Sequence, residues 1–319
     1  MLCSYTRKGE HLMNLFDFLE TFPTEESVIH YFIQKRYNNQ PVCPHCGCVE
    51  RISHNTKRPR YFQCNNCGNS FSVFRDTIFE KSTTDLRKWF YAIHLFLNAK
   101  KGISGYQLQR ELGVTYKTAW RMLNLIRSSM ASQSHEGIYE AVVEIDETYV
   151  GGKPRKGGNN ATQGKSKRGR GTSKTPIVGV VGKTDKHVHA KVAFPNQEGR
   201  RLTGKQLLEV LNTACKEAPS TVHTDQFRAY NHFERQGIMR LVVDHSTCFA
   251  KDDVHTNNIE SFWAILKRGV YGIYHHVSVK HMQHYINEFC FRWNNRNIEQ
   301  SFDKLIVNAS KTPARLKIA

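Results

Sequence analysis

Residues 141–152 read AVVEIDETYVGG, an apolar and β-branched run that predicts a β-strand with Asp146 near its centre. A second such run, TVHTD, ends on Asp225, which places this carboxylate at the open C-terminal end of a strand. Residues 255–269, HTNNIESFWAILKRG, predict an amphipathic helix that carries Glu260 close to its start. Two acids on strands and a third on a helix are a typical arrangement for binding hard divalent cations.

These three acids define the first candidate site. Three carboxylates can hold two Mg²⁺ or Mn²⁺ ions about 3.5–4 Å apart, which clamps the attacking and leaving oxygens of an in-line phosphoryl displacement. We therefore predict a nuclease or DNA strand-transfer site with Asp146, Asp225 and Glu260 as metal ligands. Because successive strand residues face opposite sides, Glu147 is not expected to share a site with Asp146, and it remains the alternative strand ligand. The alternative role for Asp225 is capping of the following helix.

The predicted helix carries further polar candidates. Lys267 lies two turns after Glu260 on the same side and could hold a phosphate. Asn257, one turn before Glu260, could contact the same metal or DNA. A covalent tyrosine mechanism remains the rival chemistry, because Arg268 and nearby histidines could activate Tyr271.

The overall composition points to a polyanionic partner. The 319 residues include 46 Lys and Arg against 28 Asp and Glu, a net charge of +18, which favours a nucleic acid as the partner. The chain has no run of 18 apolar residues, so we expect no membrane association and a cytoplasmic, nucleoid-associated location. Nine cysteines, an odd number, favour reduced thiols over a disulfide framework.

Four of the cysteines form two CxxC pairs separated by 17 residues, the spacing of a zinc ribbon. The predicted Zn²⁺ ligands are Cys43, Cys46, Cys64 and Cys67. Gly47 and Gly68 directly follow the second cysteine of each pair, where a positive φ would suit a tight turn. His45 and Cys48 lie close enough to be alternative ligands.

Two helical patterns joined through Gly113, SGYQLQRELGV and TYKTAWRMLNLIRSSM, predict a helix-turn-helix whose second helix enters the major groove. The DNA-reading residues would be Tyr116, Lys117, Thr118 and Arg121. The alternative is a helical hairpin used only for packing.

Residues 153–174 contain eight Lys or Arg and no acid, so they cannot form a core. We predict a mobile arm that follows DNA phosphates, and a solvated linker is the alternative. The arm's candidate contacts are Lys165, Lys167, Arg168 and Arg170.

The strand of Asp146 comes before the arm, and two more strand patterns follow the arm. With these three strands first, the order continues as helix, strand, helix, strand, helix. This order predicts an α/β, ribonuclease H-like fold. The predicted domains are an N-terminal helical segment (1–40), a zinc ribbon (41–76), a helix-turn-helix domain (77–135) and a catalytic domain (136–310).

Taken together, CPHCG, CNNCG, VEIDETYVGGK, VHTDQFRAY, HTNNIESFWAILKRGVYGIYHHVS and EFCFRWNNR resemble the insertion-sequence transposases of the IS1595 family, in its ISXO2-like branch. The resemblance extends from about residue 15 to residue 300. It implies a zinc ribbon and helix-turn-helix that bind terminal inverted repeats, and a ribonuclease H-like transposase domain. Some members carry Asn as the third catalytic residue, but a carboxylate is the stronger Mg²⁺ ligand.

Matched residue by residue, the resemblance makes Asp146 and Asp225 the two catalytic aspartates, Glu260 the third acid and Lys267 the lysine that follows it. It implies a DDE-type transposase that cleaves its element's ends and joins them to target DNA, acting as a homodimer or higher oligomer on DNA. Two alternatives are a DNA-binding regulator with an inactive core and a metal-dependent nuclease without strand transfer.

Overall fold

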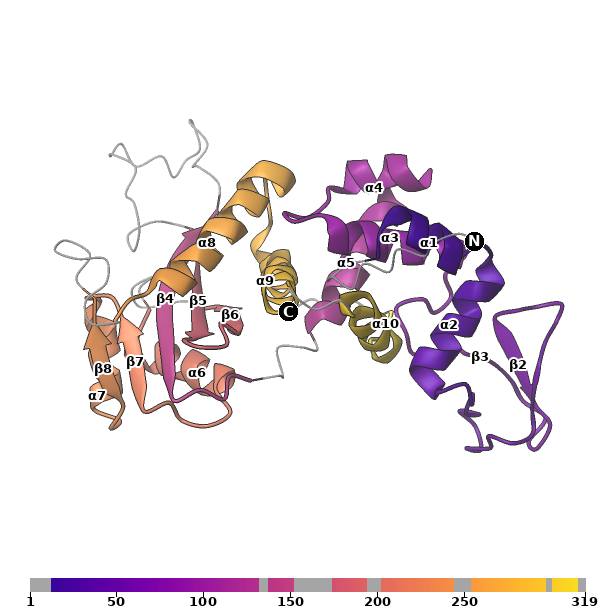
Figure 1. Ribbon diagram of the computed structural model, residues 1–319, viewed down its shortest axis with the longest axis horizontal. Helices are drawn as coiled ribbons and strands as arrows, with labels where there is room; N and C mark the ends of the chain where they lie inside the picture. The colour runs from indigo at the N-terminus through magenta and orange to yellow at the C-terminus, as the bar shows by residue number, and fades with distance from the viewer. Residues whose placement is uncertain are drawn as a thin grey trace, which may run out of the picture. The chain divides into compact units, whose positions relative to one another are not determined.

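The computed structural model describes residues 13–131, 137–151, 174–193, 202–243, 254–296 and 300–314 (Figure 1). The chain divides into two compact units. One combines the N-terminal part, up to Ser132, with a C-terminal segment from Asn295, and the other runs from Gln133 to Asn294. No helix in the described ranges is long and apolar enough to cross a membrane.

The first unit is built mainly from helices. They are α1 (Leu15–Thr21), α2 (Glu25–Tyr37), α3 (Leu86–Asn98), α4 (Gly105–Leu112), α5 (Tyr116–Met130) and α10 (Ser301–Lys311). Their core is aromatic: the ring of Phe90 on α3 lies within 6 Å of the rings of Phe22, Phe79 and Phe302. Edge-to-face and tilted ring contacts of this kind add to the free energy of burial.

Helix α10 packs with α2, α3 and α5 of this first unit. Phe302 is buried in the aromatic core, and the Tyr31 hydroxyl and Lys35 ammonium of α2 both donate to Asp303. The sequence interpretation had extended the catalytic domain to residue 310, but the second unit ends at Asn294. The difference arises because an apolar stripe on a helix shows that the helix packs against another part of the protein, but it does not show which part.

The zinc-ribbon segment forms a three-stranded antiparallel sheet in the order β1–β2–β3. Its strands are β1 (Ile52–His54), β2 (Tyr61–Cys64) and β3 (Ser70–Ser72). Strands this short leave little apolar surface to bury, so a bound metal ion is expected to contribute to their folding.

The two helices predicted on either side of Gly113 are present as α4 and α5. Gly113 ends α4 in the left-handed conformation, with φ 59°, and Thr115 caps α5 through a hydrogen bond from the Thr118 N–H. The helices and their turn are as expected, and their use as a helix-turn-helix stays a prediction.

The second unit contains a five-stranded mixed sheet in the order β6–β5–β4–β7–β8. Its elements are β4 (Val142–Val150), β5 (Thr175–Gly182), β6 (Val188–Val192), α6 (Gly204–Ala214), β7 (Thr221–Thr224), η3 (Arg228–Tyr230), α7 (Asn231–Glu234), β8 (Met239–Val242), α8 (Asn257–Gly269), the π-helical η4 (Val270–Tyr274) and α9 (Val279–Asn294). Strand β4 pairs antiparallel with β5 and parallel with β7. The predicted order of strands and helices is confirmed.

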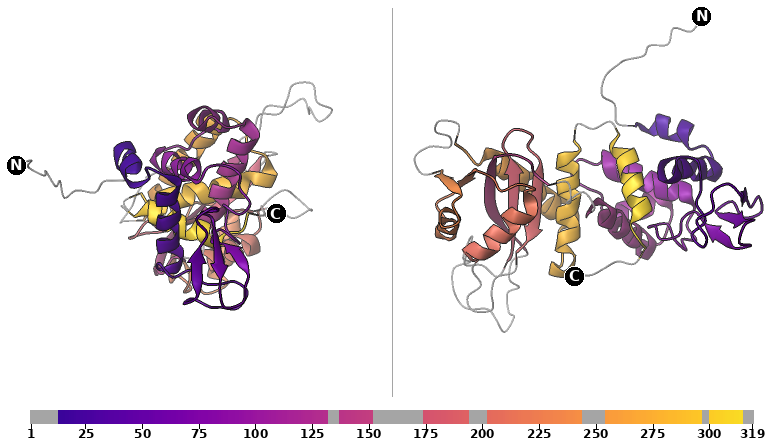
Figure 2. Two further views of the ribbon diagram at one scale, coloured as in Figure 1. Left: turned by 90° about the vertical axis from the view of Figure 1, so that its right-hand side faces the viewer. Right: turned by 90° about the horizontal axis from the view of Figure 1, so that it is seen from below.

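Helices cover both faces of this sheet, with α6 on one face and α8 and α9 on the other (Figure 2). Alternation along β4 divides its side chains: Val143 and Ile145 pack with α6, whereas Val150 packs with α8 and α9. Asp146 has the same parity as Val150, so it starts on the face that α8 covers.

Candidate metal centres

Three carboxylates come together on β4 and at the end of β7. The carboxylates each place one oxygen within 4.8 Å of the others; they belong to Asp146, Glu147 and Asp225. Asp146 is the middle residue of the nine in β4, and Asp225 directly follows β7, as the sequence predicts. Oxygen donors at this separation suit Mg²⁺ or Mn²⁺.

Glu147 belongs to this group, although alternation along the strand had argued against it. β7 pairs with β4 only from Val142↔Thr221 to Glu144↔His223, and Glu147 lies beyond the paired stretch. Alternation determines only where the Cα–Cβ bond points, and a glutamate side chain is long enough to bring its oxygens back toward the strand edge. The Tyr230 hydroxyl donates to Glu147 Oε2 at 2.8 Å and holds it there.

The turn after β7 fixes the position of Asp225. The N–H of Phe227 donates to Asp225 Oδ1 at 2.8 Å, which orients the carboxylate. From β8, Arg240 donates to the carbonyl oxygen of Asp225 and to the hydroxyl of Thr224, both at 2.8 Å. Neighbouring parallel strands therefore hold this carboxylate in place.

Crowding of negative charge changes the acid–base properties of the group. Burial, followed by the charges of Glu147 and Asp225, raises the pKa of Asp146 to about 7. Burial and the nearby carboxylates also raise the pKa of Tyr230 well above its usual value, so Tyr230 remains a hydrogen-bond donor. The Trp263 indole N–H donates to Asp146 Oδ2 at 3.1 Å and favours its charged form. A bound cation would relieve the same repulsion.

Helix α8 places the remaining predicted ligands on its solvent-facing side. Glu260 is exposed and lies outside the group of three carboxylates, and its Oε1 accepts from the Thr256 hydroxyl at 3.1 Å. Asn257 and Lys267 are also exposed. The structure thus brings Asp146 and Asp225 together and leaves Glu260 on the neighbouring helix.

Sequence reasoning missed Glu144, which anchors the start of α8 to the sheet. Its buried carboxylate accepts from the N–H groups of Asn258 and Ile259 at 3.0 and 3.1 Å, and from Asn258 Nδ2 at 2.7 Å. His255 Nδ1 lies 3.0 Å from the same carboxylate. A signal was present, because Glu144 precedes Asp146 by two positions in an otherwise apolar run and so shares its face. An anion here also complements the helix dipole.

A glycine on β5 lets α8 approach the sheet beside Asp146. Gly179 is paired with Asp146 across the ladder. A Cβ at Gly179 would come within 2.8 Å of Ile259 Cδ1 and of the Trp263 ring. The small residue therefore permits the contact that carries the Trp263–Asp146 hydrogen bond.

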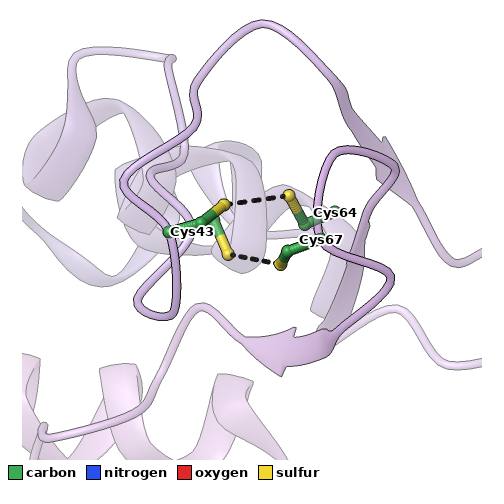
Figure 3. A group of neighbouring side chains, drawn as sticks. Cys43, Cys64 and Cys67 are labelled. Atoms are coloured by element: carbon green, nitrogen blue, oxygen red, sulfur yellow. Dashed lines mark hydrogen bonds between the residues drawn. The ribbon is translucent and has the colours of Figure 1, made fainter.

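The four predicted zinc ligands form the second candidate centre (Figure 3). Cys43 Sγ lies 3.7 Å from Cys67 Sγ, and Cys46 Sγ lies 3.6 Å from Cys64 Sγ. Thiolates about 2.3 Å from a tetrahedral zinc ion lie about 3.8 Å from one another, so the group fits Zn²⁺.

The turns that hold these cysteines follow the expected pattern. Gly47 and Gly68 have φ values of 71° and 72°. The N–H of each donates to the backbone carbonyl oxygen of the first cysteine of its pair, Cys43 or Cys64. Hydrogen bonds from the backbone and side chain of Asn69 lower the pKa of Cys67 to about 6. Neither His45 nor Cys48, the alternative ligands, belongs to the group.

Of the predicted DNA-reading residues on α5, Tyr116, Lys117 and Arg121 are exposed. Thr118 is half-buried, and its hydroxyl and N–H both contact the hydroxyl of Thr115. Tyr116 stacks on Tyr106 of α4 with ring centroids 4.5 Å apart. The predicted arm contacts Lys165, Lys167, Arg168 and Arg170 lie outside the described residues.

A four-cysteine group that fits Zn²⁺, combined with an α/β domain that carries clustered acids, defines a class of two-unit protein with two candidate metal centres. Residues 138–294 match the model of the ISXO2-like transposase domain, and residues 23–70 match the transposase zinc-ribbon domain. An uncharacterized protein in transposable element ISH50 of Halobacterium salinarum is 32% identical over 263 residues, which cover 78% of this chain and 84% of the relative. The chain belongs to the IS1595 family of transposases.

An uncharacterized transposase-like protein of Haemophilus influenzae is 30% identical over 99 residues, 31% of this chain and 79% of its own length. Among solved structures, a simian T-cell lymphotropic virus intasome in complex with the PP2A regulatory subunit B56 gamma matches with 15% identity and a TM-score of 0.30. The match covers 63% of this chain and 64% of that chain, which is less than two thirds of its length. A pre-cleavage Mos1 transpososome matches with 10% identity, 70% and 79% coverage and a TM-score of 0.30. Scores this low support no conclusion.

Proposed function

We propose that the protein is a DDE-type DNA transposase with a ribonuclease H-like catalytic domain. It binds the ends of its insertion sequence, cleaves a strand and transfers the 3′ end to target DNA. The observation that carries the proposal is that Asp146 and Asp225 come together in a domain of the transposase family, with oxygens within 4.8 Å of each other and of Glu147.

In this proposal Asp146 and Asp225 hold the divalent cations, Mg²⁺ or Mn²⁺. When bound, these ions would activate the attacking oxygen and stabilise the leaving oxygen of an in-line phosphoryl displacement. Asp225 is oriented for this role by the Phe227 N–H, and Asp146 by the Trp263 indole. Lys267, exposed on α8, would neutralise a phosphate of the bound strand.

We assign the third ligand to Glu260, as the family resemblance implies. Support comes from its position on α8, one turn before Trp263, and from its exposed carboxylate. Glu147 is the geometric alternative. Its carboxylate accepts from Tyr230 and starts on the opposite face of β4, so in this assignment Glu147 modifies the charge of the site without binding metal.

The first unit would recognise DNA. The exposed residues at the start of α5 support helix-turn-helix binding of the terminal repeats, with Tyr116, Lys117 and Arg121 as contacts. The ribbon, stabilised by Zn²⁺, would contribute to the same recognition. Two ends must be brought together for transfer, which requires at least a dimer on DNA.

The test is cleavage and strand transfer on labelled duplexes that carry the element's own ends, with Mg²⁺ and with EDTA. Asp146→Ala and Asp225→Ala should abolish both reactions and retain end binding. Glu260→Gln should behave like the aspartate variants, whereas Glu147→Gln should retain activity; the reverse pattern would move the third ligand to Glu147. Binding without cleavage would favour the regulator, and cleavage without joining would favour the nuclease.

A further inference from the structure

A basic cavity lies at the N-terminal end of α6, beside the segment that follows Asp225. Its volume is about 660 Å³. The lining residues are Thr203, Gly204, Lys205, Arg228, Ala229, Asn231, His232 and Arg235. This lining contains three Lys or Arg side chains and a histidine but no carboxylate, and it has no large apolar side chain.

The cavity exists because α6 packs unusually close to η3 and α7. A Cβ at Gly204 would come within 2.4 Å of His232 Cβ and 2.7 Å of the carbonyl oxygen of Ala229. Only glycine permits this approach. It brings Lys205 of α6, Arg228 of η3 and Arg235, which directly follows α7, around one space.

Acidic side chains of the described residues do not neutralise the positive charges that line this cavity. Within the described part of the chain, Lys205, Arg228 and Arg235 form no ion pair with an acidic side chain. Thr203 accepts from the Gln206 N–H, which leaves the N–H groups of Gly204 and Lys205 without a described protein acceptor. Unpaired cations that line one space at the start of a helix favour an anion there.

We propose that this cavity binds a phosphate of the DNA backbone, on a strand that continues to the carboxylate group. The inference rests on the proposed function. Guanidinium groups match phosphate oxygens in paired hydrogen bonds, and Arg228 follows Asp225 by three positions in the chain. The lining offers no Phe, Tyr or Trp side chain to stack a base, which favours the backbone of a polymer over a free nucleotide.

The test measures binding of the full chain to a fluorescent duplex in EDTA, over a range of salt concentrations. The double variant Arg228→Gln, Arg235→Gln should bind about tenfold more weakly at low salt, the loss expected for a charge-assisted contact. Its plot of log affinity against log salt should be shallower by about 0.9, the value for one phosphate contact. The matched control is Lys216→Gln, Lys280→Gln, which removes two exposed cations of the same unit outside the cavity.

An equal loss in the control pair would overturn the proposal, because it would show a diffuse effect of net charge. So would unchanged binding by the cavity variant. A third arm adds inorganic phosphate alone: saturable binding below about 1 mM that depends on Arg228 and Arg235 would make this a site for free phosphate and also refute the proposal. The assay measures binding alone, without divalent metal ions, so its outcomes do not depend on whether the protein cleaves or joins DNA.

Discussion

The buried carboxylate of Glu144 offers the sharpest test of how the fold positions the site. Glu144→Gln keeps the size of the side chain and replaces one acceptor oxygen by a donor amide. The native carboxylate accepts from the Asn258 N–H, the Ile259 N–H and Asn258 Nδ2, and it lies 3.0 Å from His255 Nδ1. The glutamine oxygen can keep the two hydrogen bonds from the backbone. The variant therefore loses the contacts that the other carboxylate oxygen makes with Asn258 Nδ2 and His255 Nδ1.

The expected cost follows from this count. A hydrogen bond to a charged group contributes about 1.5–3 kcal/mol, so Glu144→Gln should lower the free energy of unfolding by roughly 2 kcal/mol. For a unit of this size that corresponds to a fall in Tm of about 4–8 °C. Glu144→Ala removes every contact of the carboxylate and should cost about 3–5 kcal/mol.

Activity should fall together with stability, because Glu144 sets where α8 begins and α8 carries Asn257 and Glu260. We expect metal-dependent cleavage by Glu144→Gln to fall about tenfold or more at temperatures where the variant is folded. End binding should be unchanged. Thermal unfolding and cleavage rates measure the two effects. The control is Glu209→Gln, whose exposed ion pair with Lys191 contributes less than about 1 kcal/mol. If Glu144→Gln matches this control in both assays, the anchoring role is refuted.

Three further predictions concern the two metal centres. Because burial and neighbouring charges raise the pKa of Asp146 to about 7, the folded metal-free protein retains a proton that the unfolded chain releases, so its stability should fall as pH rises from about 4 to 7. Over the upper part of this range, Mg²⁺ affinity should rise up to about tenfold per pH unit. Calorimetric titrations that show a flat profile would contradict the assignment. Metal analysis should find one zinc per chain in the native protein and in Cys48→Ser, whereas Cys46→Ser should lose the zinc and unfold the ribbon. Gly179→Ala should cost about 1–3 kcal/mol in chemical denaturation, because its methyl group would collide with Trp263, and an unaffected midpoint would show that α8 can move away freely.

Much of this architecture could be predicted from local sequence patterns. The CxxC spacing predicted a group of four sulfurs, and the structure brings them together. Alternating apolar runs located β4 and β7, and with them Asp146 and Asp225, because strand periodicity depends only on neighbouring residues. The turn at Gly113 was predictable for the same reason, since the left-handed conformation favours glycine.

Other features depended on contacts between distant parts of the chain. The face on which Glu147 starts was predictable, but its approach to Asp146 depends on where β7 stops pairing and on the Tyr230 hydroxyl. The partners of the buried Glu144 carboxylate lie more than a hundred positions away, at the start of α8.

The sequence by itself determined which elements carry Asp146, Asp225 and the four cysteines, because spacing and periodicity are local properties. The tertiary structure alone decided that Glu147 joins the carboxylates while Glu260 stays on the neighbouring helix, that α10 completes the first unit, and that Lys205 and Arg228 line one cavity. These outcomes depend on which surfaces pack together, and packing is a property of the whole folded chain.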